Sequence, residues 1–126
     1  MCPQQRLILV VDDDHAIREA LSELLEDEGY QVACATNGQQ ALDLLARMAV
    51  PCVILLDLMM PVMDGFEFMG RKTADPALAN IPVVVITAAG AVRLEDLGGA
   101  IGALSPLVLP KPVRADTLMT AVRQFC

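Results

Sequence analysis

The sequence contains no tryptophan, one tyrosine and three phenylalanines, so aromatic rings supply little of its apolar surface. Hydrophobic residues nevertheless make up 55% of the 126 residues, which excludes an intrinsically disordered chain. The core must therefore consist of Leu, Val, Ile, Ala and Met, and we interpret the seven methionines as core residues. This length is typical of one compact domain, which we assign to residues 1–126.

Basic residues are also scarce. Nine Lys and Arg accompany sixteen Asp and Glu, which gives a net charge of −7. Such a surface repels phosphate backbones and anionic lipids, so we expect no direct binding of nucleic acid and no membrane association. No apolar run approaches the length of a transmembrane helix, and we expect no signal peptide because three aspartates follow the first run. The excess of carboxylates favours divalent cations and basic protein surfaces as partners.

The four cysteines form no CxxC pair and show no Cys/His spacing typical of a metal site. Cys34 and Cys52 lie in apolar stretches, where a free thiol behaves as a small hydrophobe. We therefore expect unpaired thiols and a reducing, cytoplasmic setting. The single histidine, His15, has no Cys or second His near it and is interpreted as a solvated surface residue.

Short apolar runs alternate with stretches in which apolar residues recur at helical spacing. The runs of strand length are 7–11, 32–35, 52–56, 83–86 and 107–109. The helical stripes are Ile17, Leu21, Leu24 and Leu25 before Gly29; Ala41, Leu44, Leu45 and Met48 before Pro51; Phe66 and Met69 after Asp64-Gly65; and Leu118, Ala121, Val122 and Phe125. Fully apolar strands separated by helices predict a parallel sheet covered on both faces, with ligands bound beyond the carboxyl ends of the strands.

Polar residues follow four of these apolar runs. They are Asp12 and Asp13, Asp57, Thr87 and Lys111. In a parallel sheet these side chains converge on one edge. Three carboxylates held close together repel one another unless a cation neutralises them, and hard oxygen ligands suit Mg²⁺. A lysine and a hydroxyl can hold phosphoryl oxygens, and an aspartate can accept a phosphoryl group covalently. The set therefore suffices for phosphoryl transfer to a carboxylate.

Each of these residues also has a purely structural interpretation. Asp13 or Asp14 could cap the helix that begins there, and Asp57 could be an ordinary polar strand end. Thr87 could be a β-branched strand residue, and Lys111 could be a solvated lysine between two prolines. The functional interpretation is favoured because all four structural interpretations would have to hold together at the strand ends.

Four stretches of the chain together resemble the receiver domains of two-component response regulators. They are Leu-Ile-Leu-Val-Val-Asp-Asp-Asp at 7–14, Leu-Leu-Asp-Leu-Met-Met-Pro-Val-Met-Asp-Gly at 55–65, Thr87-Ala88, and Lys111-Pro112. The resemblance covers essentially the whole chain. It implies an α/β, doubly wound, flavodoxin-like fold with five parallel strands in the order 2-1-3-4-5.

By this resemblance Asp57 is the phosphorylation site. Asp12 and Asp13 form the acidic pair of the metal site, and Asp13, Asp57 and the backbone carbonyl of Met59 are the expected Mg²⁺ ligands. The phosphodonor is expected to be a phosphohistidine on a sensor histidine kinase or a histidine phosphotransfer protein. Phosphorylation would change the surface that binds a downstream protein, whose identity the sequence does not contain.

The resemblance assigns Thr87 and Lys111 to contacts with the phosphoryl group, and Thr87 also to the switch. The family usually carries Tyr or Phe three residues before the lysine, where this chain has Val108. A β-branched side chain is stiff at χ1, so we expect the switch to depend on mobility of the glycine-containing segment 90–106. This departure keeps one alternative open, a pseudo-receiver that binds partners without being phosphorylated.

In this family the side chains at the positions of Met59 and Ala89 line the path of the hydrolytic water. Neither side chain can orient a water molecule by hydrogen bonding, so we expect slow loss of the phosphoryl group. An aspartyl-phosphate phosphohydrolase, the other alternative, typically needs a second acid where Met59 stands. The chain is therefore expected to be a switch rather than an enzyme, with only self-phosphorylation and slow autodephosphorylation.

Overall fold

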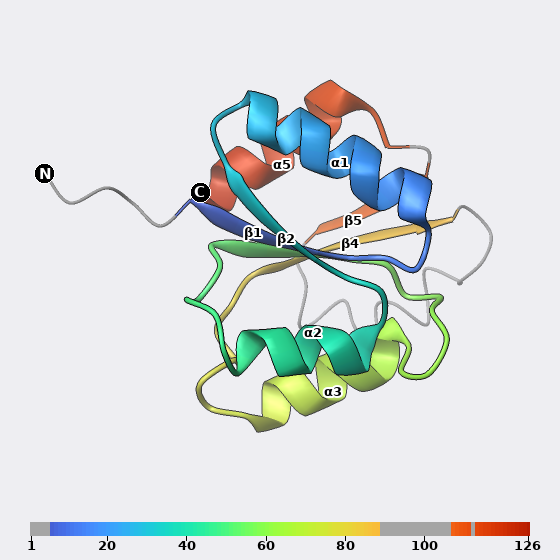
Figure 1. The fold of residues 1–126 in the computed structure, drawn as a ribbon, viewed down its shortest axis with the longest axis vertical. Helices are drawn as coiled ribbons and strands as arrows, with labels where there is room; N and C mark the ends of the chain where they lie inside the picture. The colour runs from blue at the N-terminus through green and yellow to red at the C-terminus, as the bar shows by residue number, and fades with distance from the viewer. Residues whose placement is uncertain (1–5, 89–106, 112) are drawn as a thin grey trace, which may run out of the picture.

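Five parallel strands form one sheet in the order β2-β1-β3-β4-β5, with helices on both faces (Figure 1). The computed structural model describes residues 6–88, 107–111 and 113–126. The strands are β1 (Leu7–Val11), β2 (Gln31–Ala35), β3 (Val53–Leu56), β4 (Val83–Ala88) and β5 (Leu107–Lys111). The helices are α1 (His15–Asp27), α2 (Gly38–Leu45), α3 (Gly65–Ala74) and α5 (Ala115–Phe125). The predicted fold class and strand order are confirmed.

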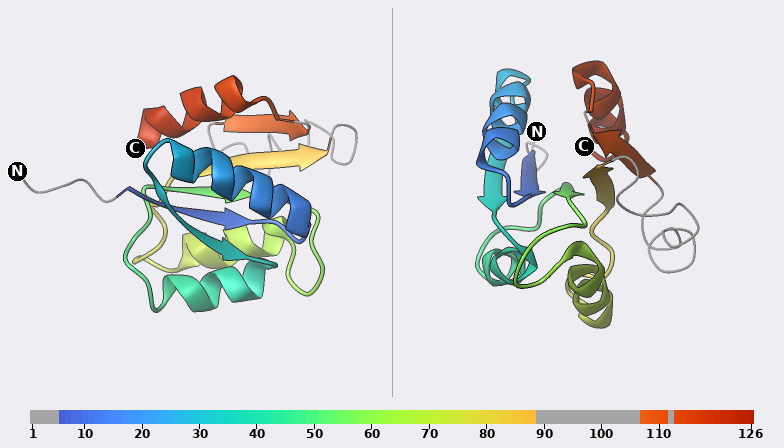
Figure 2. Two further views of the ribbon diagram at one scale, coloured as in Figure 1. Left: turned by 45° about the horizontal axis from the view of Figure 1, so that its top comes forward. Right: turned by 90° about the vertical axis from the view of Figure 1, so that its right-hand side faces the viewer.

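Helices α1 and α5 cover one face of the sheet, and α2 and α3 cover the other (Figures 1 and 2). Each face has its own core because successive strand residues point to opposite sides. In β1 and β3, Leu9 and Ile54 belong to the core on the α2 and α3 side, and Val10 and Leu55 to the core on the α1 and α5 side. All four residues of β3 are buried, which explains why its sequence is a continuous apolar run.

Strands β4 and β5 are longer than the apolar runs that predicted them. Thr87 and Lys111 are therefore within the last residues of these strands and not just beyond them. The predicted mobility of segment 90–106 concerns residues outside the described ranges, and so does the predicted role of Ala89. No helix among the described residues is long and apolar enough to cross a bilayer.

The predicted start and stop signals hold for α1, and the predicted inner face of α3 is confirmed but incomplete. Gly29, at φ +92°, follows the end of α1 in a conformation that favours glycine. In α3 the buried positions include Phe68 and Met69, whereas Phe66 is only partly buried. The predicted inner residues Phe66 and Met69 both contact the core, and Phe68, which the prediction omitted, is fully buried beside them. At about 100° per residue, positions 66 and 69 lie about 60° apart on the helix surface, so they share one face.

The cysteines differ most from expectation. Cys52, just before β3, forms a disulfide with Cys126, just after α5, although 74 residues separate them. The topology brings the end of α5 to the start of β3, which no short-range spacing in the sequence reveals. Cys34 is free, but it is exposed on β2 and not buried as a small hydrophobe. Its Sγ lies 3.3 Å from the Ser22 hydroxyl.

Candidate metal centre

Three carboxylates converge where β1 and β3 end. These strands are parallel neighbours, and the Asp57 amide donates a hydrogen bond to the carbonyl of Val11 at 2.9 Å. One carboxylate oxygen from each of Asp12, Asp13 and Asp57 lies within 4.8 Å of the others. Asp12 and Asp57 are only 3% and 5% exposed, whereas Asp13 faces solvent. The predicted convergence of these three residues is confirmed.

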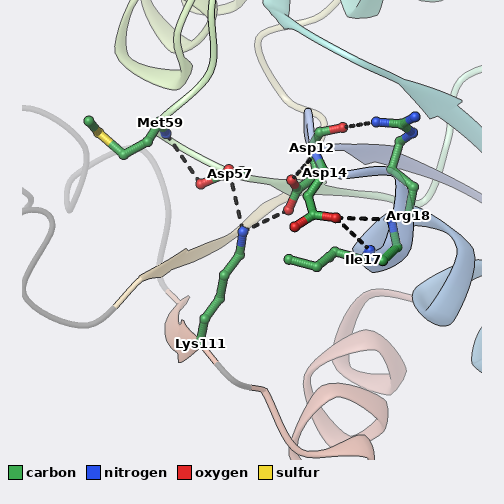
Figure 3. Close-up of polar contacts among 8 residues, drawn as sticks. Asp12, Asp14, Ile17, Arg18, Asp57, Met59 and Lys111 are labelled. Carbon is green, nitrogen blue, oxygen red and sulfur yellow. Dashed lines mark hydrogen bonds and ion pairs between the residues drawn. The ribbon is translucent and has the colours of Figure 1, made fainter.

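The third aspartate of the run, Asp14, is the one that caps α1 (Figure 3). Its Oδ1 accepts hydrogen bonds from the amides of Ala16 at 2.9 Å and Ile17 at 3.3 Å. Asp12 Oδ1 accepts from the Asp14 amide at 2.9 Å, which fixes the turn into the helix. Asp13 makes no hydrogen bond or ion pair with any described residue. The capping interpretation therefore applies to Asp14 and leaves Asp13 available for a ligand.

Lys111 extends from the end of β5 toward the carboxylates (Figure 3). Its Nζ lies 2.8 Å from Asp12 Oδ2 and 3.4 Å from Asp57 Oδ2, and its side chain is 19% exposed. The interpretation of Lys111 as a solvated loop residue is therefore wrong. Pro110, the residue before it, is tolerated in β5 because this strand is at the edge of the sheet.

The carboxylates of the cluster outnumber the positive charges near them. Burial raises the pKa of Asp57, and the Asp12 charge raises it further, although the Met59 amide and Lys111 oppose this. Burial by itself would lower the pKa of Lys111, but the hydrogen bond and charge of Asp12, together with Asp57, outweigh it and raise that pKa. One ammonium group thus faces three carboxylates, which leaves an excess of negative charge at the edge of the sheet.

The loop between β3 and α3 orients Asp57. The Met59 amide donates to Asp57 Oδ1 at 3.2 Å, and the Gly65 amide donates to the Leu58 carbonyl at 2.9 Å. A Cβ at Gly65 would lie 2.7 Å from Leu58 Cα and 2.8 Å from the Asp57 carbonyl oxygen, so only glycine permits this approach. Val62 has a φ of +67°, an uncommon conformation for a β-branched residue, in the same loop. Sequence reasoning identified Gly65 as a helix start but missed its packing against the Asp57 backbone.

Two residues assigned by resemblance lie on the neighbouring strands. Thr87 is paired with Pro110 across β4 and β5, but its side chain lies outside the part that the structure describes. Its contact with a phosphoryl group stays a prediction. Val108 is partly buried and packs against the core on the α2 and α3 side. Its role in switching also stays a prediction.

The donor set fits a hard divalent cation. All three side chains offer carboxylate oxygens, two of them buried, and the exposed Asp13 leaves one side of the cluster open to water. A cation bound there would offset the excess negative charge that Lys111 leaves uncompensated. The cluster of Asp12, Asp13 and Asp57 could therefore bind a metal ion.

Comparison with known proteins identifies the family. A family model described as the response regulator receiver domain matches residues 8–123. The chain belongs to this family. It is 39% identical over 119 residues to the sporulation initiation phosphotransferase F of Bacillus subtilis, covering 94% of this receiver domain and 91% of that protein. It is 41% identical over 118 residues to the response regulator MprA of Mycolicibacterium vanbaalenii, of which it covers 48%.

The structural comparison agrees. The chemotaxis response regulator CheY4 of Vibrio cholerae superposes on this receiver domain with a TM-score of 0.83 and 32% sequence identity, covering 98% of this chain and all of the other. Receiver domains of response regulators take phosphoryl groups from kinases or phosphotransfer proteins. The acidic cluster with its lysine lies at the strand ends, where ligands bind in doubly wound sheets.

Proposed function

We propose that this receiver domain accepts a phosphoryl group on Asp57 from a phosphohistidine of a sensor histidine kinase or histidine phosphotransfer protein, in the cytoplasm and with Mg²⁺. The observation that carries the proposal is the position of Lys111. Its Nζ lies between two buried carboxylates, 2.8 Å from Asp12 and 3.4 Å from Asp57. A charged lysine directed at a buried aspartate beside an acidic cluster suits stabilisation of a phosphoryl group more than it suits folding.

The reaction needs positioning and charge neutralisation more than acid–base catalysis. A carboxylate oxygen of Asp57 attacks the phosphorus, and a P–O bond forms as the P–N bond of the phosphohistidine breaks. The released imidazole nitrogen takes up a proton from solvent. Lys111 lies close enough to Asp57 to pair with the phosphoryl oxygens, and the Met59 amide holds the other carboxylate oxygen of Asp57.

Mg²⁺ held by the acidic cluster and the Met59 carbonyl would neutralise charge on the phosphoryl oxygens. In this role Asp13 and Asp57 supply carboxylate oxygens, and Asp12 shares its charge between the metal site and Lys111. The product stays covalently attached, so the domain is a signalling switch and not an enzyme with turnover. Phosphorylation would change the surface that it offers to a downstream protein, and slow autodephosphorylation would end the signal.

Intact-mass spectrometry tests this proposal with acetyl phosphate as the donor. We expect a single phosphoryl adduct in the presence of Mg²⁺, no adduct with EDTA, and none in Asp57→Asn. Asp43→Asn, on the exposed side of α2, is the matched control and should be phosphorylated like the wild type. An adduct that persists in Asp57→Asn would refute the assignment. A domain that binds Mg²⁺ but gives no adduct would be the pseudo-receiver.

A further inference from the structure

The Cys52–Cys126 disulfide lies at the end of the sheet opposite the acidic cluster. The Cα atoms of the two residues are 5.5 Å apart, a usual separation for a disulfide. Figure 2 shows the end of α5 beside the start of β1, at the end of the sheet where the strands begin. The five residue-to-residue steps from Cys52 to Asp57 follow β3 and span roughly 17 Å when extended. The disulfide is therefore well separated from the phosphoacceptor site.

The fold holds both cysteines in place by contacts other than the sulfur–sulfur bond. The Cys52 amide donates to the Leu7 carbonyl at 2.9 Å, which fixes the start of β3 against β1. The Cys126 amide donates to the Val122 carbonyl at 2.9 Å, in the last turn of α5. Val122 itself is fully buried in the core under α5. These backbone contacts do not depend on the disulfide and would keep the two cysteines near each other in the reduced form.

The end of α5 is also anchored to α1. Arg123 Nη2 lies 3.3 Å from Glu28 Oε1, and this pair joins the last turn of α5 to the residue that ends α1. Both side chains are solvent-accessible, so the pair contributes only weakly to stability. Such an exposed ion pair does not by itself prevent fraying of the last turn of α5.

Both redox states suit these surroundings. Cys52 Sγ lies 3.4 Å from the Leu7 carbonyl oxygen, which would accept the hydrogen of a reduced thiol. Cys52 and Cys126 are partly buried at the edge of the core and not sealed inside it. A small disulfide in solution could therefore reach the pair. In reducing compartments the disulfides that do form are usually transient or redox-sensing.

We propose that Cys52 and Cys126 form a reversible thiol–disulfide switch that fastens the last turn of α5 to the start of β3. A thiolate of the pair attacks a low-molecular-weight disulfide such as oxidised glutathione, which gives a mixed disulfide and releases one thiol. The second cysteine then attacks the mixed disulfide and releases the other thiol. The protein loses two hydrogens, and the small disulfide becomes two thiols.

The switch controls opening of α5 and not phosphorylation. The last turn of a helix frays because its final carbonyls lack helical partners. The bond stops that fraying by connecting the helix end to a buried strand. Any partner that binds the end of α5 would therefore meet a rigid surface in the oxidised form and a fraying one in the reduced form.

Thiol counting on the 126-residue chain gives the first test. After equilibration with oxidised glutathione, alkylation under denaturing conditions should add two groups, and after reduction it should add four, one for each cysteine. Peptide mapping of the oxidised form should recover a linked Cys52–Cys126 peptide. Four alkylated cysteines under both conditions, or a different linked pair, would overturn the proposal without any variant being needed.

Hydrogen exchange gives the second test. Oxidation should slow amide exchange across residues 120–126 by at least about tenfold, and Cys126→Ser should abolish this response. Cys34→Ser is the matched control, because Cys34 is free and exposed, and it should respond like the wild type. Equal exchange in both redox states would contradict the proposal. Acceptance of a phosphoryl group from acetyl phosphate should be the same in both forms, so its failure would bear on the proposed function alone.

Discussion

Asp13 and Asp14 are adjacent aspartates, and the structure predicts opposite effects on stability when each is replaced by alanine. Asp13 contacts no cation among the described residues and lies within 4.8 Å of Asp12 and Asp57. Asp14 accepts two amide hydrogen bonds at the start of α1. Without a metal ion, Asp13→Ala should therefore raise the free energy of unfolding, and Asp14→Ala should lower it.

The magnitudes follow from these contacts. Lys111 offsets part of the charge on Asp12 and Asp57, which leaves Asp13 facing about one uncompensated negative charge. Two like charges at 4.8 Å repel by about 3.5 kcal/mol at an effective dielectric of about 20, and by about 0.9 kcal/mol in water. Because Asp13 is exposed, the gain from Asp13→Ala should be about 1–2 kcal/mol. Loss of the helix cap in Asp14→Ala should cost about 0.5–2 kcal/mol.

Magnesium should remove most of the stability advantage of Asp13→Ala over the wild type. At ten times its Kd, Mg²⁺ would stabilise the wild type by about 1.4 kcal/mol because it binds only the folded protein. Asp14→Ala should keep this increment, and Asp13→Ala should lose it. A residue that weakens the free protein but is needed for metal binding is a functional residue that costs stability.

Urea denaturation followed by far-UV circular dichroism provides the assay, since the chain has no tryptophan for fluorescence. Each variant is compared with the wild type in EDTA and in excess Mg²⁺ at about pH 7. If Asp13→Ala destabilised the protein as much as Asp14→Ala in EDTA, Asp13 would be a structural residue. If Mg²⁺ left the wild-type midpoint unchanged, the metal site itself would be refuted.

Three further predictions concern the loop, the buried lysine and the lifetime of the phosphoryl group. Gly65→Ala should lower the free energy of unfolding by about 1–3 kcal/mol because the added Cβ would collide with backbone atoms. Gly70→Ala has open space around it and should raise the free energy of unfolding by roughly 0.5–1 kcal/mol. If urea titrations showed the unfolding midpoints of both variants shifted in the same direction, this argument would be wrong. Burial lowers the pKa of Lys72, which is 2% exposed, so the folded state binds fewer protons than the unfolded state at alkaline pH. The stability of the wild type relative to Lys72→Met should therefore rise as the pH approaches 10.5, by at most about 1.4 kcal/mol per pH unit, and a difference independent of pH would refute the argument. Met59→Asn should speed hydrolysis of the phosphoryl group on Asp57 in a mass-spectrometric time course, because an amide side chain can orient a water molecule and the Met59 side chain cannot. An unchanged rate would mean that other groups control the access of water to the phosphoryl group.

The strands and the site were predictable from sequence because both depend on short-range pattern. A strand such as β3, buried on both faces, must be apolar throughout. The carboxyl ends of parallel strands meet at one edge, so Asp12, Asp57 and Lys111 could be placed together before their contacts were known. The run of three aspartates was ambiguous, because the residue that caps α1 depends on the exact start of the helix.

Other features depend on tertiary contacts that sequence patterns do not encode. The disulfide joins Cys52 and Cys126 across 74 residues, so only the topology reveals it. Lys72 is charged but lies on the buried face of α3, where its Nζ donates to the Ala79 carbonyl at 3.0 Å. A polarity pattern assigns such a residue to the surface. Phe66 and Phe68 both contact the core, and the sequence pattern does not reveal that Phe68 is the more deeply buried of the two.

The identity of the phosphorylated residue is the central claim, and reductive trapping tests it most directly. Borohydride converts an aspartyl phosphate to homoserine, so treatment after reaction with acetyl phosphate and Mg²⁺ marks the acceptor permanently. Peptide mass spectrometry should then find homoserine at position 57 and nowhere else, and only when Mg²⁺ was present. Homoserine at position 12 or 13, or at position 57 in the absence of Mg²⁺, would contradict the account of this site.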